Sequence, residues 1–340
     1  MSEPGSPRVH ALDRRMLWLL GAIGLVSVVC SAARLVQLEG WWTLPAPIDG
    51  ELLPRSGALT ATWVALVLLT RRCGGRTVLV AVFGALVLAA AGAFPEPWAV
   101  AGAAAVSAGV FGASGMVLTR PAQGWRLLLE LAVSALVGLT GAVVVTGLGA
   151  SLRPYRFRVL VLALVLAGAL ALAWKLGQGP GSLGRRGAVL IVTGVVVLAA
   201  AFAYLHALHS WASPSVVADL VDLKTWVRDT LGASPRPTEA IVGFPALVWG
   251  VSIRQRRRQG WWMCAFGSLG STGLAASLSQ TSLPLTESLR ATGYDAVIGA
   301  ALGLLLIAVD RLLTGRGGHR VARGVVEVER PEPSRFAPLL

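Results

Sequence analysis

The residues best suited to chemistry gather at the end of one long apolar run. His206 and His209 lie three positions apart, so a helix places both imidazoles on one face. Asp219 and Asp222 follow, and Asp295 lies near the start of the last apolar run. Imidazoles and carboxylates are groups that transfer protons or bind a metal. Their spacing matches no metal-binding motif, so we expect no bound metal, and ordinary interfacial polar residues are the alternative.

Three arginines near an earlier run form a second candidate site. Arg153, Arg156 and Arg158 lie within six positions of one another. Arginine recognises phosphate through paired hydrogen bonds, so the group could hold the anionic part of a lipid-linked substrate. The alternative is that an apolar run close to these arginines is miscounted.

The composition indicates that these residues are carried by a membrane protein. Of the 340 residues, 55% are hydrophobic and only 14% are charged, whereas soluble domains are about 25% charged. The net charge of +13 comes from basic residues that punctuate the apolar runs and do not gather on a soluble face. We therefore expect contact with membrane lipids and no binding of nucleic acid.

The apolar runs predict an all-α polytopic membrane bundle. A helix needs roughly 20 residues to cross the hydrocarbon core of a bilayer. The sequence offers about ten such segments, which could form two inverted halves of five. We place them near residues 16–38, 56–70, 77–94, 98–119, 127–150, 158–176, 187–208, 239–253, 261–280 and 292–313.

The distribution of arginine predicts the orientation. Basic residues mark the cytoplasmic side of membrane proteins, and here they recur in alternate loops. This pattern puts both termini in the cytoplasm of a bacterial cell, with the chain in the cytoplasmic membrane. Residues 1–15 then form a short cytoplasmic segment before a bundle over residues 16–314. The loops assigned to the cytoplasm contain Arg71, Arg72, Arg76, Arg120, Arg126, Lys175, Arg185, Arg186, Arg254, Arg256, Arg257, Arg258, Arg311, Arg316, Arg320 and Arg323.

Two segments outside the predicted membrane spans have a recognisable pattern. Residues 213–232 predict an amphipathic helix at the outer membrane surface, because Leu220, Leu223, Val227 and Leu231 repeat at helical spacing. Residues 315–340 contain glycine, proline and many charged residues, and this composition predicts a mobile cytoplasmic tail.

Small residues indicate how the helices pack. Gly299 and Gly303 form a GxxxG pair that favours close packing within one bundle, with dimer formation as the alternative. The run Gly112–Gly115 has the same interpretation. No nucleotide-binding fingerprint or haem ligand pair occurs, so we expect no cofactor and no nucleotide.

These observations leave three hypotheses of function. The first is a permease-like transporter of a neutral or lipid-like small molecule, based on the number of spans and the small-residue packing. The second is a scaffold or regulatory subunit of a membrane complex, which needs no catalytic residue. The third is an envelope enzyme that acts on a lipid-linked substrate at the outer face with the histidines, aspartates and arginines named above.

Overall fold

The computed structural model is entirely helical over the residues that it describes, apart from turns and connecting loops. The structure describes residues 7–39, 51–94, 96–150, 154–176, 192, 195–196, 199, 214–254, 260–277, 284–314 and 332–339. The helices are α1 (Pro7–Glu39), α2 (Leu52–Arg72), α3 (Thr77–Ala93), α4 (Pro97–Val117), α5 (Arg126–Gly147), α6 (Pro154–Leu176), α8 (Pro214–Leu231), the π-helix η2 (Thr238–Gly243), α9 (Phe244–Arg254), α10 (Gly260–Ser277) and α11 (Leu285–Thr314).

Six of the described helices are long and apolar enough to cross a membrane. These segments are Arg15–Val36, Leu52–Arg72, Pro97–Val117, Arg126–Gly147, Arg156–Leu176 and Leu285–Leu312. Large apolar side chains such as Leu25, Phe83 and Leu164 are exposed on the outside of the bundle, as expected where lipid replaces water. The prediction of a helical membrane bundle is therefore confirmed, whereas ten spans and two inverted halves stay a prediction.

The remaining predicted spans have different outcomes. Residues 77–94 correspond to α3, which is apolar but shorter than the six helices above. Residues 239–253 correspond to η2 followed by α9, and 261–280 largely to α10. The predicted span 187–208 lies almost wholly outside the described residues.

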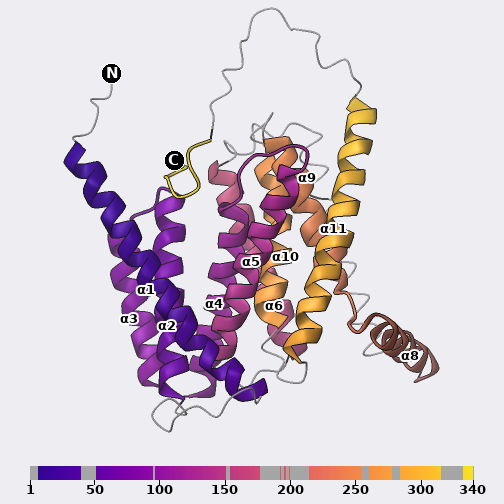
Figure 1. The fold of residues 1–340 in the computed structure, drawn as a ribbon, viewed down its shortest axis with the longest axis horizontal. Helices are drawn as coiled ribbons and strands as arrows, with labels where there is room; N and C mark the ends of the chain where they lie inside the picture. Colours follow the sequence, from indigo (N-terminus) through magenta and orange to yellow (C-terminus); the bar gives the residue numbers. More distant parts are fainter. Residues whose placement is uncertain are drawn as a thin grey trace, which may run out of the picture.

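Helix α10 is the centre of the bundle. All 18 of its residues are buried, and it packs against α4, α5, α6 and α9 (Figure 1). In contrast, α1, α2 and α3 form a group at one side, and α11 lies at the other. The core is therefore built around a helix that contacts only protein within the described part of the chain.

Glycines allow the close contacts around this central helix. A Cβ atom at Gly243 would lie 2.3 Å from the backbone nitrogen of Gly270, and one at Gly112 would lie 2.0 Å from Oγ1 of Thr272. Gly299 and Gly303 of α11 contact Phe244 and Val248 of α9 in the same way. The expected packing of the GxxxG pair within one bundle is confirmed.

The helices align so that the bundle has two distinct ends. Helix α1 begins at the end where residues 332–339 lie, and α8 projects from the other end (Figure 1). At this other end, Leu285 donates its backbone N–H to Glu39 Oε1 over 2.6 Å, which ties the start of α11 to the end of α1. The location of both termini in the cytoplasm stays a prediction.

Candidate functional site

Four charged side chains form a connected network at the end from which α8 projects. Arg158 of α6 contacts Glu239 Oε2 at 2.6 Å. Arg236 contacts Asp295 of α11 twice, through its backbone N–H at 2.6 Å and through Nε at 2.8 Å. We call Arg158, Arg236, Glu239 and Asp295 the paired cluster. Its two acids and two bases balance, so the two half-buried arginines compensate the charges of the two buried carboxylates.

The paired cluster is positioned by an irregular stretch of helix. Glu239 lies in the π-helix η2, a local geometry that is often found at functional sites. Its side chain is fully buried and faces Gly273 of α10, where a Cβ atom would lie 2.4 Å from Glu239 Oε1. That oxygen accepts no hydrogen bond from the described residues, and Arg236 Nε is 3.9 Å away. The glycine therefore makes room for a carboxylate between η2 and α10.

The paired cluster includes two of the residues proposed from the sequence. Arg158 and Asp295 are each bound to a partner of opposite charge. Arg156 is exposed, and Asp219 and Asp222 are exposed on α8, whose carboxyl end is joined to α11 through Arg228 and Leu231. His206, His209 and Arg153 lie outside the described residues, so a site that includes them stays a prediction.

Sequence reasoning missed the other two members of the paired cluster. Arg236 and Glu239 flank Pro237 in a segment that reads as a connecting loop followed by a short span. The available signal was their spacing of three positions at the start of an apolar run. In a membrane protein, an arginine and a glutamate at this spacing indicate paired charges at a helix end.

The opposite end of the bundle carries a different arrangement, built around residues 332–339. Arg335 binds Glu130 of α5 through two nitrogens, at 2.8 and 3.0 Å, and donates to the carbonyl oxygen of Leu118 at 2.7 Å. Glu332 binds Arg254 at 2.5 Å, and Leu339 donates its N–H to the carbonyl oxygen of Arg72 at 2.8 Å. Residues 332–339 are therefore fixed against the bundle by charged contacts.

These contacts bear on the tail that the sequence predicts. Residues 315–331 lie outside the described part, so the mobility expected for residues 315–340 stays a prediction there. The packing of residues 332–339 was not expected. We call Arg71, Arg72, Arg254 and Arg335, which lie in or beside this packed segment, the basic end.

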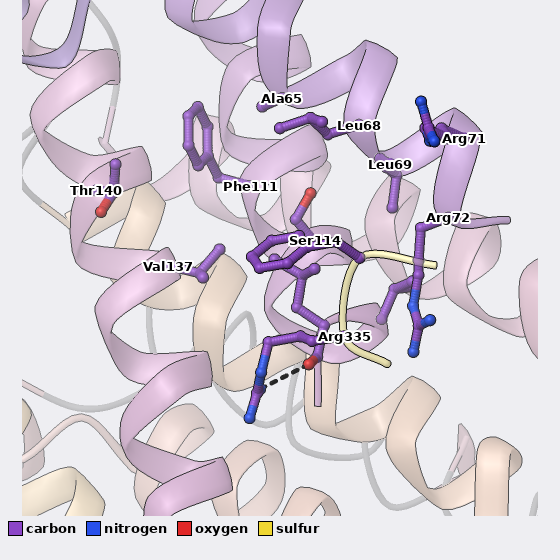
Figure 2. A pocket seen from close by; sticks show the side chains of 13 residues that line it. Ala65, Leu68, Leu69, Arg71, Arg72, Phe111, Ser114, Val137, Thr140 and Arg335 are labelled. Carbon is purple, nitrogen blue, oxygen red and sulfur yellow. Dashed lines mark hydrogen bonds between the residues drawn. The ribbon is translucent and has the colours of Figure 1, made fainter. Parts of the chain in front are cut away.

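A cavity lies beside this segment, between α2, α4 and α5. Its volume is about 160 Å³, close to the size of cavities that hold a benzene molecule. Arg72 and Arg335 lie towards one side of it, and Phe111, Val137 and Thr140 lie towards the other (Figure 2). Its lining consists of Ala65, Leu68, Leu69, Arg71, Arg72, Phe111, Ser114, Val117, Leu118, Val137, Thr140, Arg335 and Phe336.

The cavity combines an apolar depth with a cationic end. Val137 lies 11 residues into α5, which is about 16 Å along the helix axis from its start. Arg72, in contrast, is the last residue of α2. None of the described residues that line the cavity is an aspartate or a glutamate. The space is therefore suited to a molecule with an apolar body and an anionic or polar head.

Arg72 is the most unusual residue in this wall. It is 2% exposed and donates Nη1 to the carbonyl oxygens of Ser334, at 2.8 Å, and Ala337. Its Nε and Nη2 have no hydrogen-bond partner in the described structure. The two nearby acids are bound to other arginines, Glu332 to Arg254 and Glu130 to Arg335.

The described residues form no recognisable metal centre at either end. The described residues contain no group of three or more histidines, cysteines, aspartates or glutamates placed to hold a metal ion. The three cysteines, Cys30, Cys73 and Cys264, are free thiols. Comparison of the chain with protein-family models, with curated proteins and with solved structures finds no match.

Proposed function

We propose that the protein is a permease-like membrane protein that binds a lipid-like small molecule in the cavity between α2, α4 and α5. The observation that carries this proposal is the cavity itself, which extends from the end of α2 towards the middle of α5 with mainly apolar walls. An apolar body in this space loses its contact with water and keeps a polar head near the helix ends.

The packing around the cavity supports movement of the helices that line it. Gly112 and Gly115 of α4 pack against Thr272 and Ser271 of α10. Small residues bring the helix backbones close together without interlocking large side chains. A shift of α4 against the central helix would then separate no interlocked long side chains, although it would break the hydrogen bond from Ser271 Oγ to the carbonyl oxygen of Gly112.

The test is to fill the cavity and measure what the protein retains. We would purify the full chain from its host with its lipids and record native mass spectra. The wild type should carry a molecule of defined mass, and Val137→Phe should lose it because the larger side chain occupies the space. Val82→Phe is the matched control, because Val82 is 58% exposed on α3, outside the cavity.

Two outcomes would contradict this proposal. If the wild type carries no small molecule, the cavity holds no retained ligand and the proposal is wrong. If Val137→Phe and Val82→Phe retain the molecule equally, the molecule binds outside this cavity. Once its mass identifies the molecule, its passage across vesicles containing the purified protein would distinguish a transporter from a protein that only binds it.

Helix α8 favours a second function, that of a subunit in a membrane complex. Leu220, Leu223 and Trp226 are exposed along this helix, which projects from the bundle (Figure 1). Its carboxyl end is held by Arg228 to Glu287 at 2.6 Å and by Tyr294 to the carbonyl oxygen of Leu231 at 2.8 Å. Stoichiometric partner proteins in the same native mass spectra, with no bound small molecule, would favour this function over transport.

A further inference from the structure

We propose that Arg72 binds the phosphate of an anionic amphiphile whose apolar chains occupy the cavity. This inference rests on the proposed function, because it assigns the chemical class of the molecule to the same cavity. It adds a residue, a charge and a headgroup, none of which follows from an apolar cavity alone.

The first reason for this assignment is the charge balance around Arg72. A buried guanidinium is costly unless an anion compensates it. The described acids at the basic end are engaged elsewhere, because Glu130 binds Arg335 at 2.8 Å and Glu332 binds Arg254 at 2.5 Å. In the described structure Arg72 donates only to two backbone carbonyl oxygens, which carry no net charge.

The second reason is that two hydrogen-bond donors of Arg72 lack an acceptor among the described residues. Its Nε and Nη2 are buried and lack a hydrogen-bond partner among the described residues, and the side chain contributes to the cavity wall. A phosphate group offers several oxygens and can accept two parallel hydrogen bonds from a guanidinium. The unused donors therefore match an oxyanion better than a hydroxyl or an amide.

The third reason is the apolar wall of the cavity, which argues against a simple inorganic anion as the whole ligand. Leu68, Leu69, Phe111, Val117 and Val137 line the space beyond the arginine. A free phosphate would leave these walls without an apolar partner. An acyl chain would bury them, at roughly 25 cal/mol for each Å² removed from water. The ligand therefore has a phosphate at one end and a hydrocarbon chain at the other.

The packed C-terminal segment occupies part of the place assigned to the headgroup. The carbonyl oxygens of Ser334 and Ala337 now accept from Arg72, and Phe336 contributes to the cavity wall. The cavity of about 160 Å³ has room for a fragment of a lipid but not for a whole one. Binding of the complete amphiphile therefore requires residues 334–337 to move away from Arg72.

The experiment compares two lipids that differ only in the phosphate. The full-length protein in detergent is mixed with dioleoyl phosphatidic acid or with dioleoylglycerol, and retained lipid is measured by native mass spectrometry. We expect phosphatidic acid to bind roughly tenfold or more tightly than the glycerol lipid, which corresponds to a charge-assisted hydrogen-bond pair. Arg72→Gln should abolish this preference, and Arg72→Lys should keep part of it. Arg76→Gln is the matched control, because Arg76 is exposed just beyond the same helix.

The possible results separate this inference from the proposed function. Equal retention of the two lipids by the wild type would overturn the phosphate site and leave a lipid-binding cavity in place. This arm needs no variant, so it holds even if Arg72→Gln fails to fold. Retention of neither lipid would overturn both proposals. Displacement of phosphatidic acid by inorganic phosphate would assign the site to a soluble phosphate and overturn the amphiphile. An equal loss of preference in Arg76→Gln would indicate attraction to general positive charge and would also overturn it.

Discussion

The two ends of the bundle treat buried charge in opposite ways. In the paired cluster, two arginines face two carboxylates, and each acid has an arginine within 2.8 Å. At the basic end, Arg254 and Arg335 have acid partners, whereas Arg72 has only carbonyl partners among the described residues. Paired opposite charges are typical of a network that stabilises the fold, whereas a cation without an acid partner is typical of an anion-binding site. The difference supports the proposal that the paired cluster stabilises one end and that Arg72 binds a ligand at the other.

The sharpest way to break this comparison is to remove one charge from each end. Asp295→Ala should lower the free energy of unfolding by about 2–4 kcal/mol, because Arg236, whose side chain is only 13% exposed, loses its closest acid. Arg72→Met removes a cation that lacks an acid partner, so we expect a change of about 1 kcal/mol or less in ligand-free protein. Unfolding of both purified variants in a denaturing detergent measures the two effects. Equal losses would mean that Arg72 is also a structural residue.

A smaller effect is expected from crowding the paired cluster. Gly273→Ala introduces a Cβ atom 2.4 Å from Glu239 Oε1, so the carboxylate must move away from Arg158 at a cost of about 1–3 kcal/mol. Gly102→Ala is the control, because its Cβ atom would have no neighbour within 4 Å and should be neutral or stabilising by about 0.5–1 kcal/mol. The same detergent unfolding assay applies. A Gly273→Ala protein as stable as its control would show that Glu239 has room to move.

The contact between residues 332–339 and the bundle can be measured by a double-mutant cycle. Arg335→Gln and Glu130→Gln, alone and together, should give a coupling energy of about 0.5–3 kcal/mol, because the two side chains form paired hydrogen bonds. The more exposed pair Arg228 and Glu287, at 2.6 Å, should give less than about 1 kcal/mol. A coupling energy of zero between Arg335 and Glu130 would mean that this pair does not hold residues 332–339 against the bundle.

The last expected effect is a change in thiol reactivity beside Arg72. Burial raises the pKa of the Cys73 thiol to about 11, and the charge of Arg72 opposes that rise. At pH 8 only about one thiol in a thousand is therefore ionised, and alkylation should accelerate steadily above that pH. In protein with Cys30 and Cys264 replaced by alanine, Arg72→Met should slow alkylation of Cys73 because the stabilising charge is lost. An unchanged rate would indicate that the Arg72 charge is already compensated.

The helical membrane bundle followed from the sequence because long apolar runs leave few alternatives. The runs around Leu25, Phe111 and Leu164 became helices close to the predicted bounds, since a backbone in lipid must satisfy its own hydrogen bonds. Arg158 and Asp295 were named, but their pairing partners were not. Pairing depends on which helix ends meet across 59 or more positions of chain, and one sequence carries no signal of that.

The cavity and the packed C-terminal segment escaped prediction for a different reason. Residues 332–339 belong to a tail, residues 315–340, that is rich in charged residues, glycine and proline, and this composition predicts a solvated segment. What holds them are specific contacts, of Arg335 with Glu130 and of Glu332 with Arg254. Such contacts depend on geometry that composition does not encode. In the sequence, the small side chain of Ala65 likewise indicates close packing of helices, although in the structure it lines the cavity.

The complete burial of α10 has a consequence for how the chain is made. Eight of its 18 residues are glycine, serine or threonine, and a segment enters the bilayer from the translocon according to its own apolar character. The side chains of Ser271 and Thr272 find their acceptors in the carbonyl oxygens of Gly112 and Ser268. Because α4, α5 and α6 are synthesised first, they form the site that receives this helix. Because α10 is not among the six described helices that are apolar enough to cross a membrane, we expect it to insert only after α4, α5 and α6 have assembled. The order of synthesis is then part of the information that specifies the fold.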